Sequence, residues 1–268
     1  MTYALIDADV VCYRAAIVQQ STFKWDSATT TTMVEEGGEH KAAECALEMV
    51  KAWTKLAGCN RAVLAFTGAN NFRKTILPTY KANRTSGKPL VYQNTVMAVA
   101  DRYRTERVDG LEGDDLLGIM STGSFQGNSV IVSIDKDLRT IPGRFFNPMK
   151  STEGVQEVTE AQADFWWLMQ TLMGDTSDGY KGLPGCGAVK AEQILKRAGR
   201  PLTELWKEVA MAYRLKKLSE AVALQQARVA RILRSEDWNK ADRTIRLWHP
   251  TTPEWIALDK ETTIGPSN

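Results

Sequence analysis

Histidine is scarce in this sequence, which has only His40 and His249 among its 268 residues. Cysteine is also little used, and the four cysteines are widely separated, at positions 12, 45, 59 and 186. Because no pair has the C-x-x-C spacing, a zinc site or a disulfide framework is not expected, and we predict buried free thiols. Chemistry that needs several histidines is therefore excluded, and any catalysis is expected to depend on carboxylates.

Long apolar runs are missing too, since no stretch approaches the roughly 20 residues that a membrane helix needs. Asp7 and Asp9 interrupt the apolar N-terminus and no basic segment precedes it, so a secretory signal is not expected. The formal net charge is only +2, so a nucleic-acid partner must be inferred from local clusters of charge. The default expectation is a soluble, cytoplasmic monomer.

Short apolar segments alternate with helical patterns in the first part of the chain. We predict buried strands at 4–7, 61–66 and 129–134 with a shorter one near 143–147, helices at 8–20, 41–57 and 93–104, a hairpin at 21–37 and a basic loop at 70–92. This alternation predicts an α/β domain with a largely parallel sheet over residues 1–158. After residue 158 the pattern becomes almost wholly helical, which predicts a second, helical region over 159–268 packed on the first.

Acidic residues cluster at the ends of the predicted elements. The eight candidates are Asp7, Glu112, Asp114, Asp115, Asp135, Asp137, Asp175 and Asp178. Ligands bind outside the carboxyl ends of parallel strands, so acids that follow different strands can converge at one edge. In an extended segment Asp135 and Asp137 would share one side, and in a helical segment Asp175 and Asp178 would share one face.

So many carboxylates in one cleft would repel one another and raise several pKa values. Divalent cations remove this difficulty, because hard oxygen ligands suit Mg²⁺ or Mn²⁺ and two such ions can clamp a phosphodiester during displacement. Each acid taken singly could instead cap a helix or close a turn. Asp9 is left open between a helix cap and a ligand that acts through water.

Basic residues dominate the segment 73–104, where a single acid, Asp101, accompanies seven of them: Arg73, Lys74, Lys81, Arg84, Lys88, Arg102 and Arg104. The segment is either a solvated surface or an arch that contacts phosphates. If it is helical, Lys81 and Arg84 share a face and could hold the scissile phosphate and stabilise the transition state. Tyr80 could stack on an unpaired base or simply pack.

A glycine-rich turn, GYKGLPGCG, precedes a helix predicted from residue 188. Its glycines permit close approach of a phosphate backbone, and the N-terminus of the helix favours anions. The candidate DNA contacts here are Lys181, Gly182, Gly185, Gly187 and Lys190. Later basic residues such as Arg231 and Arg234 could extend this surface or be solvated. None of these contacts would read base edges, so binding would be independent of sequence and sensitive to salt.

The sequence resembles the 5′-nuclease (flap endonuclease-like) superfamily, and within it the 5′→3′ exonucleases of short-tailed coliphages. The matching stretches, which together span roughly residues 3–198, are LIDAD, FRKTILPTYKANR, LEGDDLLG, SIDKDL and GDTSDGYKGLPGCGAVKAEQIL. The resemblance implies a PIN-like core with a helix–hairpin–helix-like DNA-binding region. It also implies that the eight acids bind Mg²⁺ or Mn²⁺, directly or through water, that two ions are present, and that K⁺ binds at the glycine-rich turn.

For the basic segment, the resemblance implies an arch over about 70–104 in which Arg73, Lys81 and Arg84 are catalytic, with Lys74 and Tyr80 contacting DNA. The chain departs from the family at Gly68, where an aspartate usually follows the second strand. We therefore expect a metal-dependent 5′→3′ exonuclease of duplex DNA that could also cleave flaps and remove RNA from RNA–DNA hybrids. The alternatives are a DNA-binding relative without catalysis and a haloacid-dehalogenase-type phosphatase.

Overall fold

The structure is a computed structural model that describes residues 1–25, 30–84, 87–197 and 201–258. Its centre is a six-stranded sheet with the order β5-β4-β1-β6-β7-β8. The strands are β1 (Tyr3–Asp7), β4 (Arg61–Thr67), β5 (Arg104–Val108), β6 (Ser129–Val132), β7 (Gly143–Phe146) and β8 (Gln156–Val158). Every neighbouring pair is parallel except β7 and β8, which are antiparallel. The predicted α/β class with a largely parallel sheet is confirmed.

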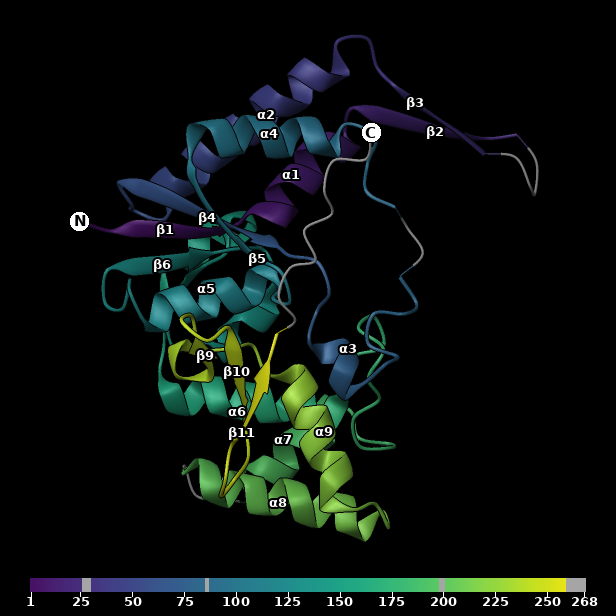
Figure 1. Cartoon of the computed structure of the whole chain (residues 1–268), viewed down its shortest axis with the longest axis vertical. Coiled ribbons are helices and arrows are strands. Elements are labelled where there is room, and N and C mark those ends of the chain that lie inside the picture. The colour runs from purple at the N-terminus through teal and green to yellow at the C-terminus, as the bar shows by residue number, and fades with distance from the viewer. Residues whose placement is uncertain (26–29, 85–86, 198–200, 259–268) are drawn as a thin grey trace.

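Helices cover both faces of this sheet (Figure 1). They are α1 (Ala8–Ile17), α2 (Gly38–Leu56) and α4 (Tyr92–Arg102) on one face and α5 (Gly113–Thr122) on the other. Side chains alternate along β1, so Ala4 and Ile6 pack beneath the first three helices while Leu5 packs against α5. Strands β1, β4 and β6 are buried on both sides over most of their length, which explains why each reads as a continuous apolar run.

Three short elements depart from the predictions for this region. The segment Arg104–Val108, which begins where the predicted helix 93–104 was to end, is the edge strand β5, and its charged side chains explain why its strand character was not recognised. The short edge strand β8 was not predicted either. The predicted loop 70–92 contains the one-turn helix α3 (Arg73–Ile76). The predicted hairpin is confirmed as β2 (Gln20–Lys24) and β3 (Thr30–Val34), although its turn lies outside the described residues.

Four helices follow the sheet: α6 (Glu160–Met173), α7 (Ala188–Leu195), α8 (Leu202–Leu215) and α9 (Glu220–Ala230). They surround a core of their own, which includes Trp167 and Tyr213 and also takes in Tyr80 from the basic segment. None of the helices in the part of the chain that the structure describes is long and apolar enough to cross a membrane. The four cysteines are free thiols, two buried and two half-buried.

The prediction of almost wholly helical structure after residue 158 is wrong for the last part of the chain. Three short strands form an antiparallel sheet there: β9 (Trp238–Asn239), β10 (Thr244–Leu247) and β11 (Glu254–Ala257). Ile232 and Ile245 from this part pack with Leu5 and Leu117 of the first domain. The C-terminal segment thus returns to the α/β core, and the boundary near residue 158 stays a prediction.

Short 3-10 helices complete the chain at η1 (Lys136–Thr140), η2 (Pro148–Glu153) and η3 (Ser235–Asp237). The first of these follows β6 at the edge of the sheet where β1 and β4 also end, because all three strands run in the same direction. Asp7 is the last residue of β1 and Thr67 is the last residue of β4. This shared edge is where the candidate site lies.

Candidate active site

A cleft of about 440 Å³ lies at the carboxyl ends of β1 and β4. Seven of the eight predicted acids line it, together with one more: Asp7, Glu112, Asp114, Asp135, Asp137, Asp175, Asp178 and Asp9. They come from four separate segments of the chain. The structure thus brings together side chains that are up to 171 positions apart in the sequence. Their role as metal ligands stays a prediction.

Asp7 joins the end of β1 to the start of α1. One of its carboxylate oxygens accepts a hydrogen bond from the amide of Val10 at 3.2 Å, which caps the helix, and the other accepts one from the hydroxyl of Ser133 at 3.1 Å. Burial, helped by the nearby charge of Asp9 and opposed by these two hydrogen bonds, raises the pKa of Asp7 to about 7. The position of Asp7 at the end of β1 therefore places this acid in the cleft.

Glu112 and Asp114 lie at the start of α5. Glu112 accepts a hydrogen bond from the phenol of Tyr80 at 2.9 Å and forms an ion pair with the ammonium of Lys81. Burial alone would raise its pKa, but the charges of Arg73 and Lys81 hold it below the usual range. Asp114 is in the opposite situation, because burial and the carboxylates around it raise its pKa well above the usual range. Asp114 is thus the acid whose ionisation most needs a cation.

Asp135 and Asp137 both reach the cleft, but not through an extended backbone as predicted. Asp135 caps the helix η1, and its Oδ1 accepts a hydrogen bond from the amide of Asp137 at 2.8 Å. Burial raises the pKa of Asp137 to about 6, and the charge of Asp135 contributes. Ser133 links this pair to Asp7, because its hydroxyl oxygen also accepts a hydrogen bond from the amide of Asp135.

Asp175 and Asp178 lie in a turn and not in a helix-like segment, so that prediction is wrong. The turn is closed by a β-bridge between Asp175 and Tyr180, and Oδ1 of Asp175 accepts hydrogen bonds from the amides of Ser177 and Asp178. Although burial opposes them, these hydrogen bonds lower the pKa of Asp175. The turn still places both acids in the same cleft.

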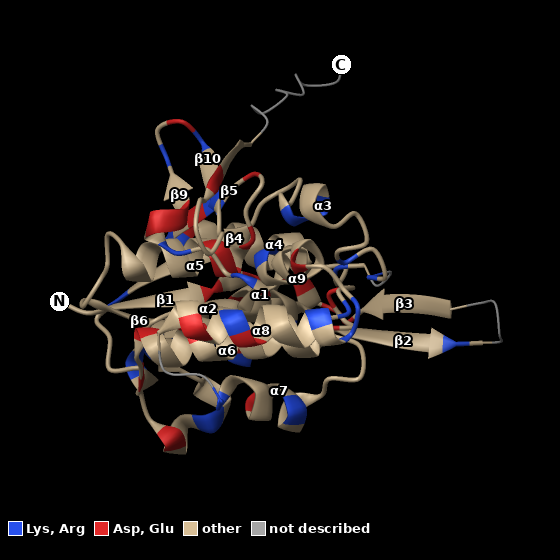
Figure 2. Ribbon diagram, turned by 90° about the horizontal axis from the view of Figure 1, so that it is seen from below, with Lys and Arg blue, Asp and Glu red and all other residues tan. Residues whose placement is uncertain are grey.

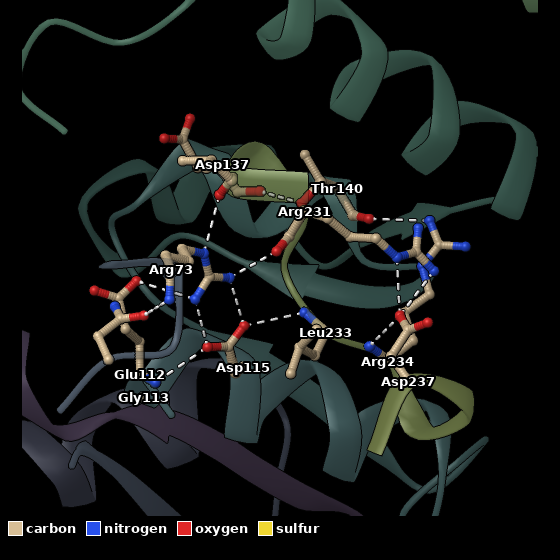
Figure 3. A network of polar contacts seen from close by, with 12 residues as sticks. Arg73, Glu112, Gly113, Asp115, Asp137, Thr140, Arg231, Leu233, Arg234 and Asp237 are labelled. Carbon is tan, nitrogen blue, oxygen red and sulfur yellow. Dashed lines mark hydrogen bonds and ion pairs between the residues drawn. The ribbon is translucent and has the colours of Figure 1, made fainter. Parts of the chain in front are cut away.

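Asp115 does not take the place that the sequence suggested, because it pairs with Arg73 (Figure 3). Asp115 is fully buried and does not line the cleft, since both its oxygens accept hydrogen bonds from the guanidinium of Arg73 at 2.7 Å. Arg73, only 2% exposed, also donates to the carbonyl oxygens of Val229 and Arg231. The structure therefore corrects the expectation for Asp115, because this ion pair joins the basic segment to α5 and to the end of α9 and occupies both carboxylate oxygens. Arg73 does line the cleft, where its guanidinium lies 3.7 Å from Glu112, and its catalytic role stays a prediction.

The basic segment carries two cations into the cleft, although it is not a continuous helix. Lys81 has a φ of +53°, and its ammonium lies 3.7 Å from Asp178, while the guanidinium of Arg84 lies 2.6 Å from the same carboxylate. Tyr80 is buried and donates to Glu112 and Asp178, so it is not available to stack on a base. Lys74 is exposed and lies outside the cleft.

The glycine-rich turn serves two different purposes. Gly182 is buried with a φ of +61°, and a Cβ there would lie 2.3 Å from the amide of Gly174, so packing explains this glycine and a phosphate contact is not supported. Gly185 and Gly187 are exposed and have open space around them. Lys181 and Lys190 are exposed as well. Lys and Arg positions, blue on the ribbon of Figure 2, lie on α7, which directly follows this turn, and on α8.

Arg231 and Arg234 are not part of a DNA-binding surface. Both are at most 5% exposed, and they form ion pairs with buried acids, Arg231 with Asp237 at 2.8 Å and Arg234 with Asp164 at 2.7 Å. Burial of both partners shows that these pairs hold the C-terminal segment onto α6 and η3. The expectation that they could extend the surface of candidate DNA contacts is wrong.

Sequence reasoning also missed residues that support the acids. Ser133 bridges two acidic segments, and Tyr92 donates its phenol to Asp9 from the start of α4. A small polar residue directly after an apolar strand, as in S-I-D, could have indicated Ser133. No local signal marks Tyr92, because its partner is 83 positions away.

The donor set of the cleft fits a hard divalent cation in kind, because every candidate ligand is a carboxylate and the pKa values of Asp7 and Asp137 are raised by burial and mutual repulsion. Within the described ranges, however, no three Asp, Glu, His or Cys side chains converge closely enough to hold one ion. The structure therefore supports metal-binding chemistry in this cleft but gives no coordination geometry.

An acidic cleft at the end of a parallel sheet, bordered by Lys81 and Arg84, defines a nuclease of the metal-dependent class. The family model for the 5′-3′ exonuclease N-terminal resolvase-like domain matches residues 2–163. The chain therefore belongs to the 5′-3′ exonuclease family. The haloacid-dehalogenase alternative needs a strand directly before the late acids, and α6 stands there instead.

Two phage proteins match almost the whole chain. The exodeoxyribonuclease of Enterobacteria phage T3 is 29% identical and the exonuclease of Escherichia phage T7 is 28% identical, each over 92% of this chain and 92% or 93% of its own length. In fold, the chain is similar to the flap endonuclease of bacteriophage T5, with a TM-score of 0.63 at 14% identity over 86% of this chain and 89% of that one.

Proposed function

We propose that this chain is a divalent-metal-dependent exonuclease that hydrolyses the phosphodiester bonds of duplex DNA from 5′ ends. The observation that carries the proposal is the convergence of seven predicted carboxylates on one cleft, next to Lys81 and Arg84. The names of the two phage relatives and the T5 structure, described as a complex with DNA and metal ions, support it.

Two ions, Mg²⁺ or Mn²⁺, are proposed for the cleft. The seven predicted acids that line the cleft would hold them: Asp7, Glu112, Asp114, Asp135, Asp137, Asp175 and Asp178. When bound, the ions supply an activated water and neutralise the charge that develops on the phosphate. Asp115 is left out of this set because Arg73 occupies both its oxygens.

Lys81 and Arg84 act on the phosphate. In the structure their charges are directed at Glu112 and Asp178. Once cations satisfy these carboxylates, the two side chains are free to turn toward a scissile phosphate and stabilise its transition state. Arg73 lines the same cleft, but its guanidinium is held by Asp115 and by two backbone carbonyl oxygens, so we propose no phosphate contact for it.

The remaining partners are proposed from the exposed surface near the glycine-rich turn and from the resemblance. The exposed N-terminus of α7, with Lys181 and Lys190, would hold the duplex away from the cut, and K⁺ would bind at the turn before it. Flaps and RNA–DNA hybrids would fit the same site, since nothing in it reads bases. A monomer acting in the host cytoplasm completes the proposal.

The experiment is cleavage of a duplex labelled at either end in the presence of Mg²⁺. Loss of the 5′ label first, as short products, is expected. Asp114→Asn should abolish cleavage and leave DNA binding largely intact, because the change removes a charge and no DNA contact. Tight DNA binding without cleavage in Mg²⁺ or Mn²⁺ would instead identify a non-catalytic relative, and equal loss of binding and cleavage would remove Asp114 from the ligand set.

A further inference from the structure

Strand β4 ends without a carboxylate, at the position where the family usually has one. The backbone explains this, because a Cβ at Gly68 would lie 2.1 Å from the carbonyl oxygen of Val108 and 2.6 Å from its carbonyl carbon. The preceding residue, Thr67, uses its hydroxyl to accept a hydrogen bond from the amide of Gly113 at 3.1 Å. The end of β4 therefore contributes no negative charge to the cleft.

A carboxylate from another element lies at this place. Asp9 is in the first turn of α1, and its Oδ2 accepts a hydrogen bond from the amide of Thr67 at 2.8 Å. Its Oδ1 accepts one from the phenol of Tyr92, and the ammonium of Lys88 lies 3.8 Å away. Asp9 lines the same cleft as Asp7 and is close enough to raise the pKa of that acid.

We propose that Asp9 supplies the metal-binding carboxylate that strand β4 cannot carry. The inference deepens the proposed function and rests on it. Two neutral donors, from Thr67 and Tyr92, fix the carboxylate against the corner of the cleft. An ionised carboxylate has about four acceptor positions, so the two hydrogen bonds leave it able to bind a cation directly or through water.

Lys88 already places a positive charge beside Asp9, and a metal ion bound to Asp9 would have to displace it. Its side chain is 61% exposed and its ammonium is 3.8 Å from Asp9, so the ion pair is of the weak surface kind and is easily displaced. A purely structural role for Asp9, tying β4 to α1 and α4, would need the hydrogen bonds but not the charge. Asparagine at position 9 separates these two roles, because its amide can keep the bond to Thr67 but carries no charge.

The experiment measures Mn²⁺ affinity by calorimetry without DNA, and cleavage separately. Asp9→Asn is expected to weaken Mn²⁺ binding by about 10- to 100-fold. Moving the carboxylate back to the strand, in the double variant Asp9→Asn with Thr67→Asp, should recover most of the affinity, since Thr67 already lines the cleft. Asp101→Asn, an exposed acid on α4, is the control and should leave Mn²⁺ affinity unchanged.

The outcomes separate this inference from the proposed function. If Asp114→Asn weakens Mn²⁺ binding and Asp9→Asn does not, the role given to Asp9 is overturned and the exonuclease proposal stands. If Asp9→Asn weakens binding but the double variant recovers nothing, position 9 does not replace the end of β4. If the unmodified protein neither binds Mn²⁺ nor cleaves DNA, the proposed function itself fails.

Discussion

Replacing Asp115 with asparagine should destabilise the protein strongly while leaving the metal-binding cleft in place. The variant keeps the size of the side chain but leaves the guanidinium of Arg73 buried without its charged partner (Figure 3). Removing one member of a buried ion pair typically costs about 3–5 kcal/mol. Asp115 also accepts hydrogen bonds from the amides of Glu112 and Leu233, so the loss also affects the start of α5 and the C-terminal segment. The upper half of that range is therefore expected.

Urea unfolding followed by circular dichroism measures this loss, with Lys74→Met as the control because Lys74 is the exposed neighbour of Arg73. The double variant Arg73→Met with Asp115→Leu should be more stable than Asp115→Asn alone, since it leaves no unpaired buried charge. Mn²⁺ affinity of folded Asp115→Asn should match that of the unmodified protein. The reasoning would be refuted if Asp115→Asn changed the free energy of unfolding by less than about 0.5 kcal/mol, as surface substitutions do, and yet lost Mn²⁺ binding. Asp115 would then be restored as a metal ligand.

Three further outcomes are expected. Tyr80→Phe removes the hydroxyl that donates a hydrogen bond to Glu112, and hydrogen bonds to charged groups contribute about 1.5–3 kcal/mol. The variant should therefore lower the single-turnover cleavage rate at least tenfold and leave DNA affinity unchanged. Gly68→Ala should destabilise by about 1–3 kcal/mol in urea unfolding because of the clash with Val108, whereas Gly187→Ala, with open space around it, should be close to neutral. Mg²⁺ at 100 times its dissociation constant should stabilise the folded protein by about 2.7 kcal/mol and so raise its melting temperature, and chelation should reverse the shift. An unchanged melting temperature would contradict binding of Mg²⁺ to the folded state.

The parts of the fold that could be predicted are those whose residues are buried on both sides. β1, β4 and β6 are continuous apolar runs, and an acid at or just after such a run must come out at the sheet edge. The convergence of Asp7 with Asp135 follows from this alone. Short polar strands gave no such signal, so β5 and β9–β11 were missed, because their pairing is decided by tertiary contacts and not by composition.

The parts of the site that could not be predicted depend on contacts between distant residues. Asp114 and Asp115 are adjacent and chemically identical, but successive helical positions point about 100° apart, so they face different surroundings. Which of them faces the cleft is settled by Arg73, 42 positions away, whose guanidinium binds Asp115. Likewise, nothing in the local sequence separates an arginine that lines the cleft beside Asp178, such as Arg84, from one buried in an ion pair, such as Arg73.

The pairing of acids with bases inside the cleft has a consequence for how metal and DNA binding depend on each other. Lys81 forms an ion pair with Glu112, and Arg84 forms one with Asp178. If the proposed function holds, a phosphate that draws these cations away would expose the carboxylates and strengthen their attraction for a metal, and a metal bound to the carboxylates would release the cations for a phosphate. Because coupling between two binding sites is reciprocal, the factor by which DNA tightens metal binding must equal the factor by which metal tightens DNA binding. Substituting Lys81 should therefore reduce, by the same amount, the factor by which DNA tightens metal binding and the factor by which metal tightens DNA binding. Such a result would show that Lys81 acts by changing its partner from a carboxylate to a phosphate and not by its charge alone.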